Sequence, residues 1–342
     1  MRRWIPIVMI IVMVLVLVPT TSTQAQGVFG CPFTNQQDCD LLLSAVQNTG
    51  ELDTVNIDDI SLGLLVTFDD SINVVELSAN GPTVLNEEGD VSQARWDAAL
   101  MSNDDISPFK LILKDGSLYV DVKPSDDTSD WLAIDPSDVG AGEIVDFTFL
   151  FNTLNFKNLV DVLNDVGDGV VWTKGMDTDI KGEVASVYFA EFSTSSLVQT
   201  SYFYQQVKVS IVDLARGAGL GNIDEDTTSF IIDFLVDILA DQLGAANFRV
   251  KWIIGQQSQQ LYALSIDGRG DIDLGLLAPV LDLKQDGGFS YTVNINVNLS
   301  AHNQPVEVTI PENRVGAGAA AFDGILQFIL ELLFGQRAEL QL

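Results

Sequence analysis

The clearest pattern along the chain is a strict alternation of apolar and polar residues over positions 289–299. Successive side chains of a β-strand point to opposite faces, so this alternation predicts a strand with one buried face and one face in water. The apolar positions are Tyr291, Val293, Ile295, Val297 and Leu299, and the intervening positions are Thr292, Asn294, Asn296 and Asn298.

Two β-hairpins are the next strongest predictions. Residues 109–113 and 118–122 flank Asp115-Gly116, a pair typical of a type I′ turn. Residues 247–254 and 260–267 form the second hairpin. Further strands are predicted at residues 60–68, 72–79, 170–173, 183–192, 199–212 and 306–310.

Helices are predicted at residues 39–47, 156–166 and 228–243, and in the C-terminal segment. Strands outnumber these helices, and most strands are joined through hairpins. The pattern therefore favours an α+β fold, a large antiparallel sheet with a few helices on one face. No linker rich in Pro or Ser and no internal repeat divides the chain, which favours one main domain.

The helix at 228–243 and the C-terminal helix are apolar on most of their surface. A surface helix has an apolar stripe about 100° wide, and both exceed it. Their narrow polar stripes are Asp233, Asp237 and Asp241 in the first helix and Asp323, Gln327 and Glu331 in the second. Two interpretations stay open, deep burial or the lining of a cavity for an acyl chain. The C-terminal helix has a third interpretation, docking onto a second copy or an envelope protein, or contact with a membrane surface, which the absence of Lys and Arg from its polar stripe disfavours.

Charge narrows the classes of partner. The chain has 48 acidic and 17 basic residues and a net charge of −31. Such acidity disfavours binding to nucleic acid or to an anionic membrane surface. The chain is nevertheless 47% hydrophobic, with a mean hydropathy of +0.23, so it can bury a core.

The N-terminus has the layout of a secretory signal peptide. Two arginines precede an apolar run over residues 4–18, and small residues precede Gln26. The run is shorter than the roughly 20 residues of a spanning helix. We therefore expect cleavage near Ala25 and a secreted or extracytoplasmic protein. The alternatives are an uncleaved anchor and lipidation at Cys31.

The two cysteines, Cys31 and Cys39, enclose a short loop in a chain expected to be exported. This context predicts a disulfide between them. Two cysteines and one distant histidine do not make a closed zinc site.

No motif indicates catalysis. His302 is the single histidine, and no G-x-S-x-G sequence supplies a nucleophilic serine. Residues 267–273 carry several aspartates but depart from the EF-hand pattern at Arg269 and Ile272. The sequence therefore predicts a protein that is not an enzyme and that has no cofactor and no metal.

Two segments carry a resemblance to a known family. The first is FKLILKDGSLYVDVKPSDDTSDWLAI, with Tyr119 and Trp131, and the second is NQPVEVTIP at residues 303–311. Together with the order of elements, they make the chain resemble bacterial exported proteins of the LolA/LppX-like group, including the LppX, LprA, LprF and LprG lipoproteins. The resemblance covers about residues 41–311. It implies a strongly curved antiparallel half-barrel wrapped around a few helices, with a lipid pocket between sheet and helices and no catalytic residues.

We therefore expect a signal peptide at residues 1–25, a disulfide loop and helix at 26–50, a lipid-binding domain at 51–315 and an apolar helical tail at 316–342. The expected function is that of a secreted carrier for a lipid or another hydrophobic small molecule. The alternative is a cell-surface structural or interaction module with a solid core and a C-terminal docking helix. The candidate pocket residues are Phe230, Ile231, Phe234, Leu235, Ile238, Leu239, Trp252 and Tyr262.

Overall fold

The computed structural model describes residues 33, 35–68, 71–86, 91–103, 105–122, 131–134, 163, 166–193, 195–196, 246–273 and 288–316. Several predictions lie outside these residues: the signal peptide, the strand at 199–212, the helix at 228–243, the apolar tail after residue 316 and, apart from residues 163 and 166, the helix at 156–166. The predicted disulfide has only Cys39 among them, so it stays a prediction.

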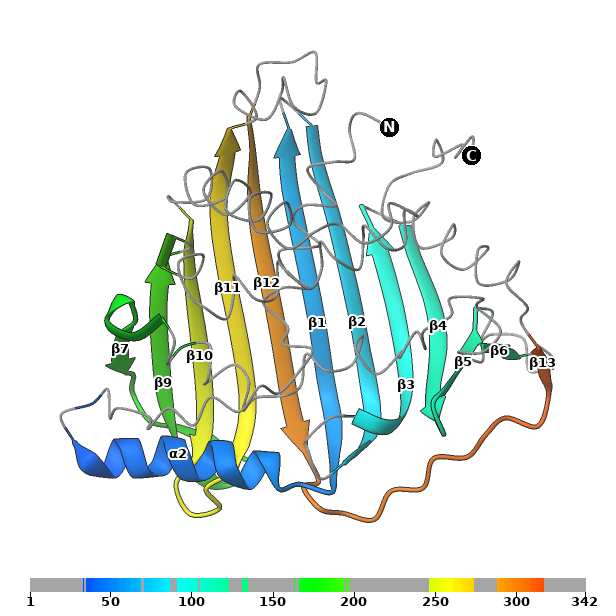
Figure 1. Ribbon diagram of the computed structural model, residues 1–342, viewed down its shortest axis with the longest axis horizontal. Helices are drawn as coiled ribbons and strands as arrows, with labels where there is room; N and C mark the ends of the chain where they lie inside the picture. The colour runs from blue at the N-terminus through cyan, green and yellow to red at the C-terminus, as the bar shows by residue number, and fades with distance from the viewer. Residues whose placement is uncertain are drawn as a thin grey trace, which may run out of the picture.

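The described residues form one sheet of 13 strands (Figure 1). Its first half consists of β1 (Thr54–Phe68), β2 (Ser71–Leu85), β3 (Val91–Ser102), β4 (Asp105–Lys114), β5 (Ser117–Asp121) and β6 (Trp131–Ile134). Its second half consists of β7 (Val171–Lys174), β8 (Thr178–Ile180), β9 (Glu183–Ser193), β10 (Asn247–Gly255), β11 (Leu261–Asp273), β12 (Gly288–Ser300) and β13 (Arg314–Gly316).

Strand order brings the two halves of the chain together at the middle of the sheet. The order is β13-β6-β5-β4-β3-β2-β1-β12-β11-β10-β9-β7, and β8 pairs with β9. The central pair is β1 with β12, in register from Asn56 opposite Ser300 to Phe68 opposite Phe289. All of these pairs are antiparallel except β13 with β6. The sheet is thus antiparallel, as predicted, and open, because its end strands β13 and β7 do not pair with each other.

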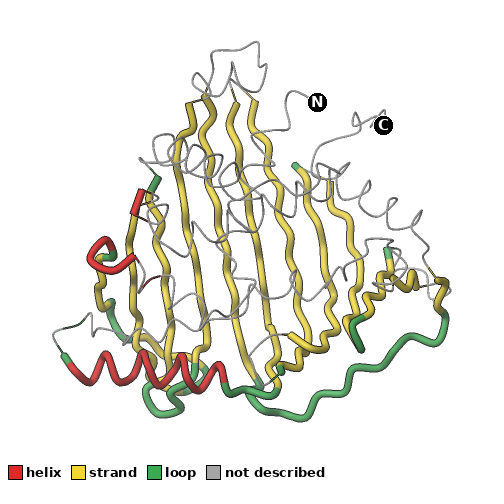
Figure 2. The backbone as a smooth tube through the Cα atoms, in the orientation of Figure 1, coloured by secondary structure: helices red, strands yellow, loops and turns green. Residues whose placement is uncertain are grey.

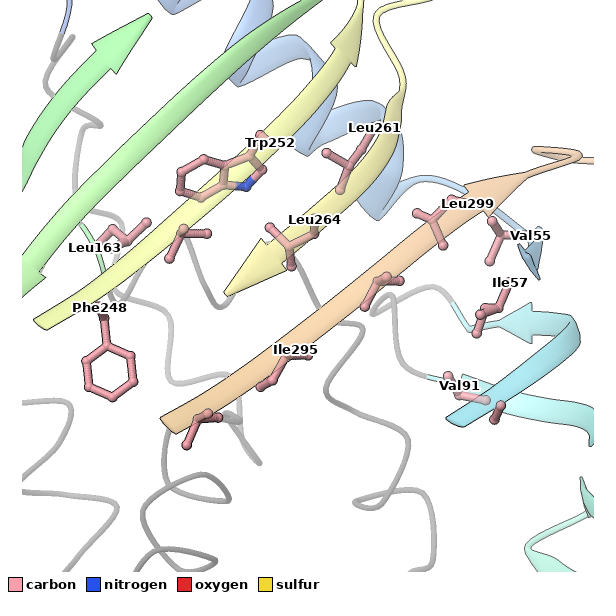
Figure 3. Packing of buried hydrophobic residues seen from close by; sticks show 14 of the residues in the cluster. Val55, Ile57, Val91, Leu163, Phe248, Trp252, Leu261, Leu264, Ile295 and Leu299 are labelled. Atoms are coloured by element: carbon pink, nitrogen blue, oxygen red, sulfur yellow. The ribbon is translucent and has the colours of Figure 1, made fainter. Parts of the chain in front are cut away.

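The alternation predicted for residues 289–299 is confirmed in β12. Its five apolar side chains are only 1–7% exposed, and the residues between them are partly or fully exposed. On β10 the same face carries Phe248, Val250, Trp252 and Ile254, all buried. We call this side of the sheet the apolar face and the opposite side the polar face. Figure 3 shows part of the buried layer on the apolar face.

Both predicted hairpins are present. The β4–β5 turn has positive φ at Asp115 (53°) and Gly116 (76°), as a type I′ turn requires. The second hairpin joins β10 and β11, with a register shift at Ile253/Ile254.

Two of the differences from the predicted strands lie at β1 and β3, in the first half of the sheet. Strand β1 begins at Thr54 rather than at residue 60, because a register shift between Ile57 and Ile60 interrupts its alternation. Strand β3 was not predicted. Its buried positions include Ala94 and Ala98, whose small side chains give a weak apolar signal.

The prediction of a strand at residues 306–310 is wrong. This segment has no strand pairing and runs from the end of β12 toward β13, drawn in orange along the lower edge of Figure 1. Val308 is 2% exposed and forms a small apolar cluster with Ile112 and Tyr119 on the polar face. The Lys114 ammonium donates a hydrogen bond to the carbonyl oxygen of Val308. This segment has no backbone ladder, so the burial of its side chains fixes its position. Its alternating apolar residues provide that burial.

Helix α2 (Gln36–Gly50) contains the predicted helix at 39–47 and is the one α-helix longer than a single turn among the described residues. The Asn35 side chain caps its N-terminus by accepting a hydrogen bond from the backbone N–H of Gln37, 3.1 Å away. The helix crosses the lower ends of the strands in Figure 2 and buries Leu42 and Ala45 in the core. Within the part of the chain that the structure describes, no helix is long and apolar enough to span a membrane.

Candidate functional site

An aromatic cluster lies on the apolar face where β7, β9 and β10 meet. Trp252 of β10 is opposite Tyr188 of β9 and stacks on Trp172 of β7, with 5.2 Å between ring centroids and an interplanar angle of 16°. Phe33, which precedes α2, contacts Trp172 edge-on at 5.8 Å and Tyr188 at 5.0 Å. These four rings form a continuous aromatic surface, and we call it the Trp252 cluster.

A second aromatic pair extends this surface along the same strands. Phe192 and Phe248 stack at 5.7 Å with an interplanar angle of 17°. The Phe248 ring lies against Gly268 of β11, where a Cβ atom would collide with the ring carbons. Glycine at this position therefore lets the ring lie flat on the neighbouring strand.

One carboxylate is buried beside the Trp252 cluster. Asp38 of α2 is 8% exposed and accepts hydrogen bonds from the Tyr188 hydroxyl at 2.8 Å and the Lys174 ammonium at 2.7 Å. Burial acts to raise the pKa of Asp38, but the hydrogen bonds from Lys174 and Tyr188 outweigh it and hold the pKa below its usual range. Burial, together with Asp38, raises the pKa of the Tyr188 hydroxyl. Asp38 thus stays ionised at neutral pH and ties α2 to β7 and β9.

The structure separates the two described pocket candidates. Trp252 is at the centre of the apolar face, 1% exposed. Tyr262 lies at the register shift of β11, and its hydroxyl donates to Glu183 at 3.0 Å. The other six candidates, Phe230, Ile231, Phe234, Leu235, Ile238 and Leu239, lie outside the described residues, so they remain predictions.

Tyr262 belongs to a polar cluster around the β10–β11 turn. Glu183 accepts hydrogen bonds from the backbone N–H groups of Gln257 (2.6 Å) and Ser258 (2.7 Å). Burial acts to raise the pKa of Glu183, but these backbone hydrogen bonds outweigh it and lower the pKa. His302 packs edge-on against Tyr262 at 5.5 Å. The arrangement anchors a turn, and nothing in it resembles a nucleophile with its base.

His302 lies just after β12, with its Nε2 atom 3.0 Å from the carbonyl oxygen of Leu261. Burial lowers the pKa of its imidazole. A neutral imidazole can donate from Nε2 to this carbonyl, which matches a histidine at a strand end.

Replacing Glu183 with glutamine should destabilise the protein by about 1–2 kcal/mol, because the charge that strengthens two backbone hydrogen bonds is lost. Urea unfolding followed by tryptophan fluorescence measures this change. The matched control is Glu191→Gln on the same strand, where the carboxylate pairs with the exposed Arg249 at 3.2 Å. The control should change stability by less than about 0.5 kcal/mol. Equal losses in the two variants would contradict the role assigned to Glu183.

A cavity of about 690 Å³ opens on the polar face, near one end of β9–β12. Its lining includes Glu191, Arg249, Asp267, Arg269, Thr292 and Asn294. Arg249 lies over the Phe189 ring at 4.0 Å, and Asn294 donates to Asp267 at 2.6 Å. This cavity is open to water and is lined by charged and amide side chains as well as by apolar ones such as Phe192 and Phe248, so it does not match the apolar pocket expected between sheet and helices.

The aspartates of residues 267–273 do not converge on one point. Asp267 bonds to Asn294, and Asp271 accepts from the Ser290 hydroxyl at 2.6 Å. Among the residues described, no three His, Cys, Asp or Glu side chains are grouped closely enough to hold a metal ion.

The sequence prediction missed three members of the Trp252 cluster, Phe33, Trp172 and Tyr188, and the carboxylate of Asp38. Trp172 and Tyr188 do lie in segments predicted as strands. Their aromatic side chains could be seen in the sequence, but the sequence did not show which strands lie next to β10.

Comparisons with known proteins place the chain among distant structural neighbours. No family model matches the sequence, and no curated protein matches it. A structure of LprF from Mycobacterium bovis is similar over 82% of this chain and 99% of that one, at 13% identity and a TM-score of 0.40. Lipoprotein LppX from Mycobacterium tuberculosis is similar over 80% and 100%, at 14% identity and a TM-score of 0.30.

A LolA superfamily protein from Nitrosomonas europaea is similar over 79% of this chain and 96% of that one, at 9% identity and a TM-score of 0.20. The group that the sequence resembles thus recurs among these solved structures. Likeness at such low identities and TM-scores leaves the function of this chain to be inferred from its own residues.

Proposed function

We propose that this protein is an extracytoplasmic, non-enzymatic carrier that holds a hydrophobic ligand against the apolar face of its sheet. The observation that carries the proposal is the breadth of that face. One apolar cluster extends from Leu113 and Val120 near one edge of the sheet to Tyr188 and Phe192 near the other. Helix α2 adds Leu42 and Ala45 to this cluster, and it does so at the end of the sheet that the helix crosses (Figure 2).

The apolar face is not equally buried everywhere. Leu77 of β2 is 39% exposed and Leu62, opposite it on β1, is half-buried, whereas Leu100, opposite it on β3, is 6% exposed. Trp252 and Val250 on β10 are at most 1% exposed. The less buried part, around Leu77, is the side from which we expect a ligand to reach the apolar face. Burial of its apolar surface, at about 25 cal/mol per Å², would supply the affinity.

The predicted signal peptide and the net charge of −31 support a location outside the cytoplasm. The net negative charge of the chain would keep such a carrier soluble while its ligand is covered. The helix at 228–243 remains the proposed cover of the ligand.

The test is to purify the protein under native conditions, extract it with organic solvent and identify the extract by mass spectrometry. We expect a stoichiometric hydrophobic molecule, and we expect the emptied protein to bind a fluorescent fatty-acid probe. The matched control is the same protein unfolded in urea before washing, which should retain no lipid. If the native protein yields no lipid and binds no probe, the carrier function is wrong.

A second function, a cell-surface interaction module with a solid core, is favoured by the near-complete burial of Val250, Val293 and Val297. In this case the predicted tail at 316–342 would be the docking element. The extraction would then yield no lipid, and deletion of residues 316–342 would convert an oligomer into a monomer in light scattering.

A further inference from the structure

The cavity on the polar face is built from two neighbouring rows of side chains that cross β9–β12, the strands that lie side by side in Figure 1. Each row follows the strand register, and both rows line the cavity with side chains that are partly or fully exposed. The first row is Glu191, Arg249, Asp267 and Asn294, and the second is Ser193, Asn247, Arg269 and Thr292. Rows two residues apart along a strand are about 7 Å apart, so one ligand can contact both.

Arg269 supplies the free donor of this cavity. Its neighbours in the second row are the uncharged Asn247 and Thr292. Among the described residues, its guanidinium has no ion pair and no hydrogen bond. Arg249 differs, because it pairs with Glu191 at 3.2 Å. The N–H groups of Arg269 are therefore available to a molecule in the cavity.

Asp267 supplies a matching acceptor in the first row, two residues before Arg269 on the same strand. Its Oδ1 atom accepts a hydrogen bond from the Asn294 side chain at 2.6 Å. Its Oδ2 atom accepts none from the residues that the structure describes. A carboxylate accepts at both oxygens, so one acceptor remains for a ligand beside the free guanidinium.

The balance of charge in the cavity restricts the class of ligand. The described lining carries two guanidiniums, Arg249 and Arg269, and two carboxylates, Glu191 and Asp267. An anion would be repelled by the carboxylates, and a cation by the guanidiniums. A hydrocarbon would take these polar groups out of water without giving them partners.

A hydroxyl group both donates and accepts hydrogen bonds. A molecule with several neighbouring hydroxyls can therefore satisfy the donor-only guanidinium of Arg269 and the acceptor-only carboxylate of Asp267 together. Val171 of β7, opposite Glu191 and 61% exposed, adds apolar lining that C–H groups of the same molecule can contact. The volume of about 690 Å³ lies within the range of roughly 300–1,000 Å³ that small-molecule sites have.

We propose that the cavity on the polar face binds a neutral oligosaccharide, with Arg269 donating to its hydroxyl groups and Asp267 accepting from them. The site lies on the opposite side of the sheet from the ligand of the proposed carrier. It therefore adds a second binding activity and does not depend on the first.

The experiment is isothermal titration calorimetry of the purified full chain with maltohexaose, cellohexaose and chitohexaose. These probes carry no acyl chain, so the apolar face offers them nothing. We expect at least one of them to bind. Its affinity should change less than about twofold between about 0.01 M and about 1 M salt, because salt screens charges and not hydroxyl groups. Hexagalacturonate, an acidic saccharide of the same length, should not bind.

Two variants place the saccharide in the cavity. Arg269→Ala and Asp267→Ala should each weaken binding by about 10-fold or more, the effect of losing a hydrogen bond to a charged group. The matched control is Arg314→Ala, which removes an exposed arginine from β13 at the far edge of the sheet. This control should bind the saccharide as the unchanged protein does. Arg269 is exposed and unpaired among the described residues, so its removal should leave the unfolding midpoint in urea unchanged.

The inference is wrong if none of the neutral oligosaccharides binds, or if hexagalacturonate binds more tightly than they do. Binding that survives both Arg269→Ala and Asp267→Ala also overturns it, because the saccharide would then lie outside this cavity. Extraction of lipid from Arg269→Ala should give the same result as extraction from the unchanged protein. The carrier function is therefore tested separately from the saccharide site.

Discussion

Replacing Gly81 with alanine is expected to destabilise the protein by about 3 kcal/mol or more. Gly81 of β2 has φ +146°, a conformation that L side chains rarely adopt. A Cβ atom there would collide with the carbonyl oxygen of Arg95 and lie 3.2 Å from the Cα atom of Trp96. Both the conformational strain and the collision with a backbone atom of β3 oppose the substitution.

The position of Gly81 explains why this close approach exists. Gly81 pairs with Ile57, next to the register shift in the pairing of β1 with β2. An alanine would have to move β3 away, and β3 carries Trp96 on the apolar face. We therefore expect Gly81→Ala to disturb the buried layer itself.

Urea unfolding at neutral pH measures the effect. The matched control is Gly63→Ala on the adjacent strand β1, where a Cβ atom would make only ordinary contacts, 3.8 Å from the carbonyl oxygen of Asn294. This control should be neutral or slightly stabilising, by less than about 1 kcal/mol, because alanine restricts the unfolded chain. A Gly81→Ala protein as stable as the control would contradict the geometry assigned to this strand.

Replacing Asp38 with alanine is the second large expected effect, a loss of about 2–3 kcal/mol. The substitution removes the carboxylate acceptor of the buried Tyr188 hydroxyl and the ionic partner of Lys174. Asp40→Ala is the matched control, because Asp40 is exposed and its carboxylate accepts an exposed hydrogen bond from Gln36 at 2.9 Å. The control should change the free energy of unfolding by less than about 0.5 kcal/mol.

The loss at Asp38 should depend on pH in a defined direction. Its pKa in the folded state is lowered, so its contribution is fully present above the unfolded-state pKa of about 3.9. The contribution disappears as the pH falls from about that value through the lower, folded-state pKa. Unfolding free energies of the two proteins, measured at pH 7 and near pH 3, should therefore differ less at the acidic pH. A constant difference would show that Asp38 does not act as an ionised acceptor.

Much of the fold follows from local sequence. The alternation in β12, the Asp-Gly turn between β4 and β5 and the helix around Leu42 were all predictable, because each depends on neighbouring residues alone. Strand β3 was not predicted because several of its buried side chains are small. The early start of β1 was not predicted because a bulge interrupts its alternation. In both places the local apolar signal is weak although the tertiary contacts are strong.

The candidate site was less predictable than the fold. The sequence named Trp252 and Tyr262 together, although Tyr262 belongs to the Glu183 cluster and Trp252 to the apolar face. Strand alternation alone does not reveal the register shift at Ile253/Ile254 that separates them. One extra residue in a strand is enough to change the direction in which every later side chain points.

The sequence by itself determined most of the segments that become strands and the apolar side of each, because periodicity and turn chemistry are local properties; β3 and the segment at 306–310 are exceptions. Only the tertiary structure decided that β12 pairs with β1, that the four rings of the Trp252 cluster meet, and that the Trp96 indole donates to Thr83. These features depend on pairing between residues up to about 240 positions apart. Long-range register sets such pairing, and the same local patterns are compatible with many registers.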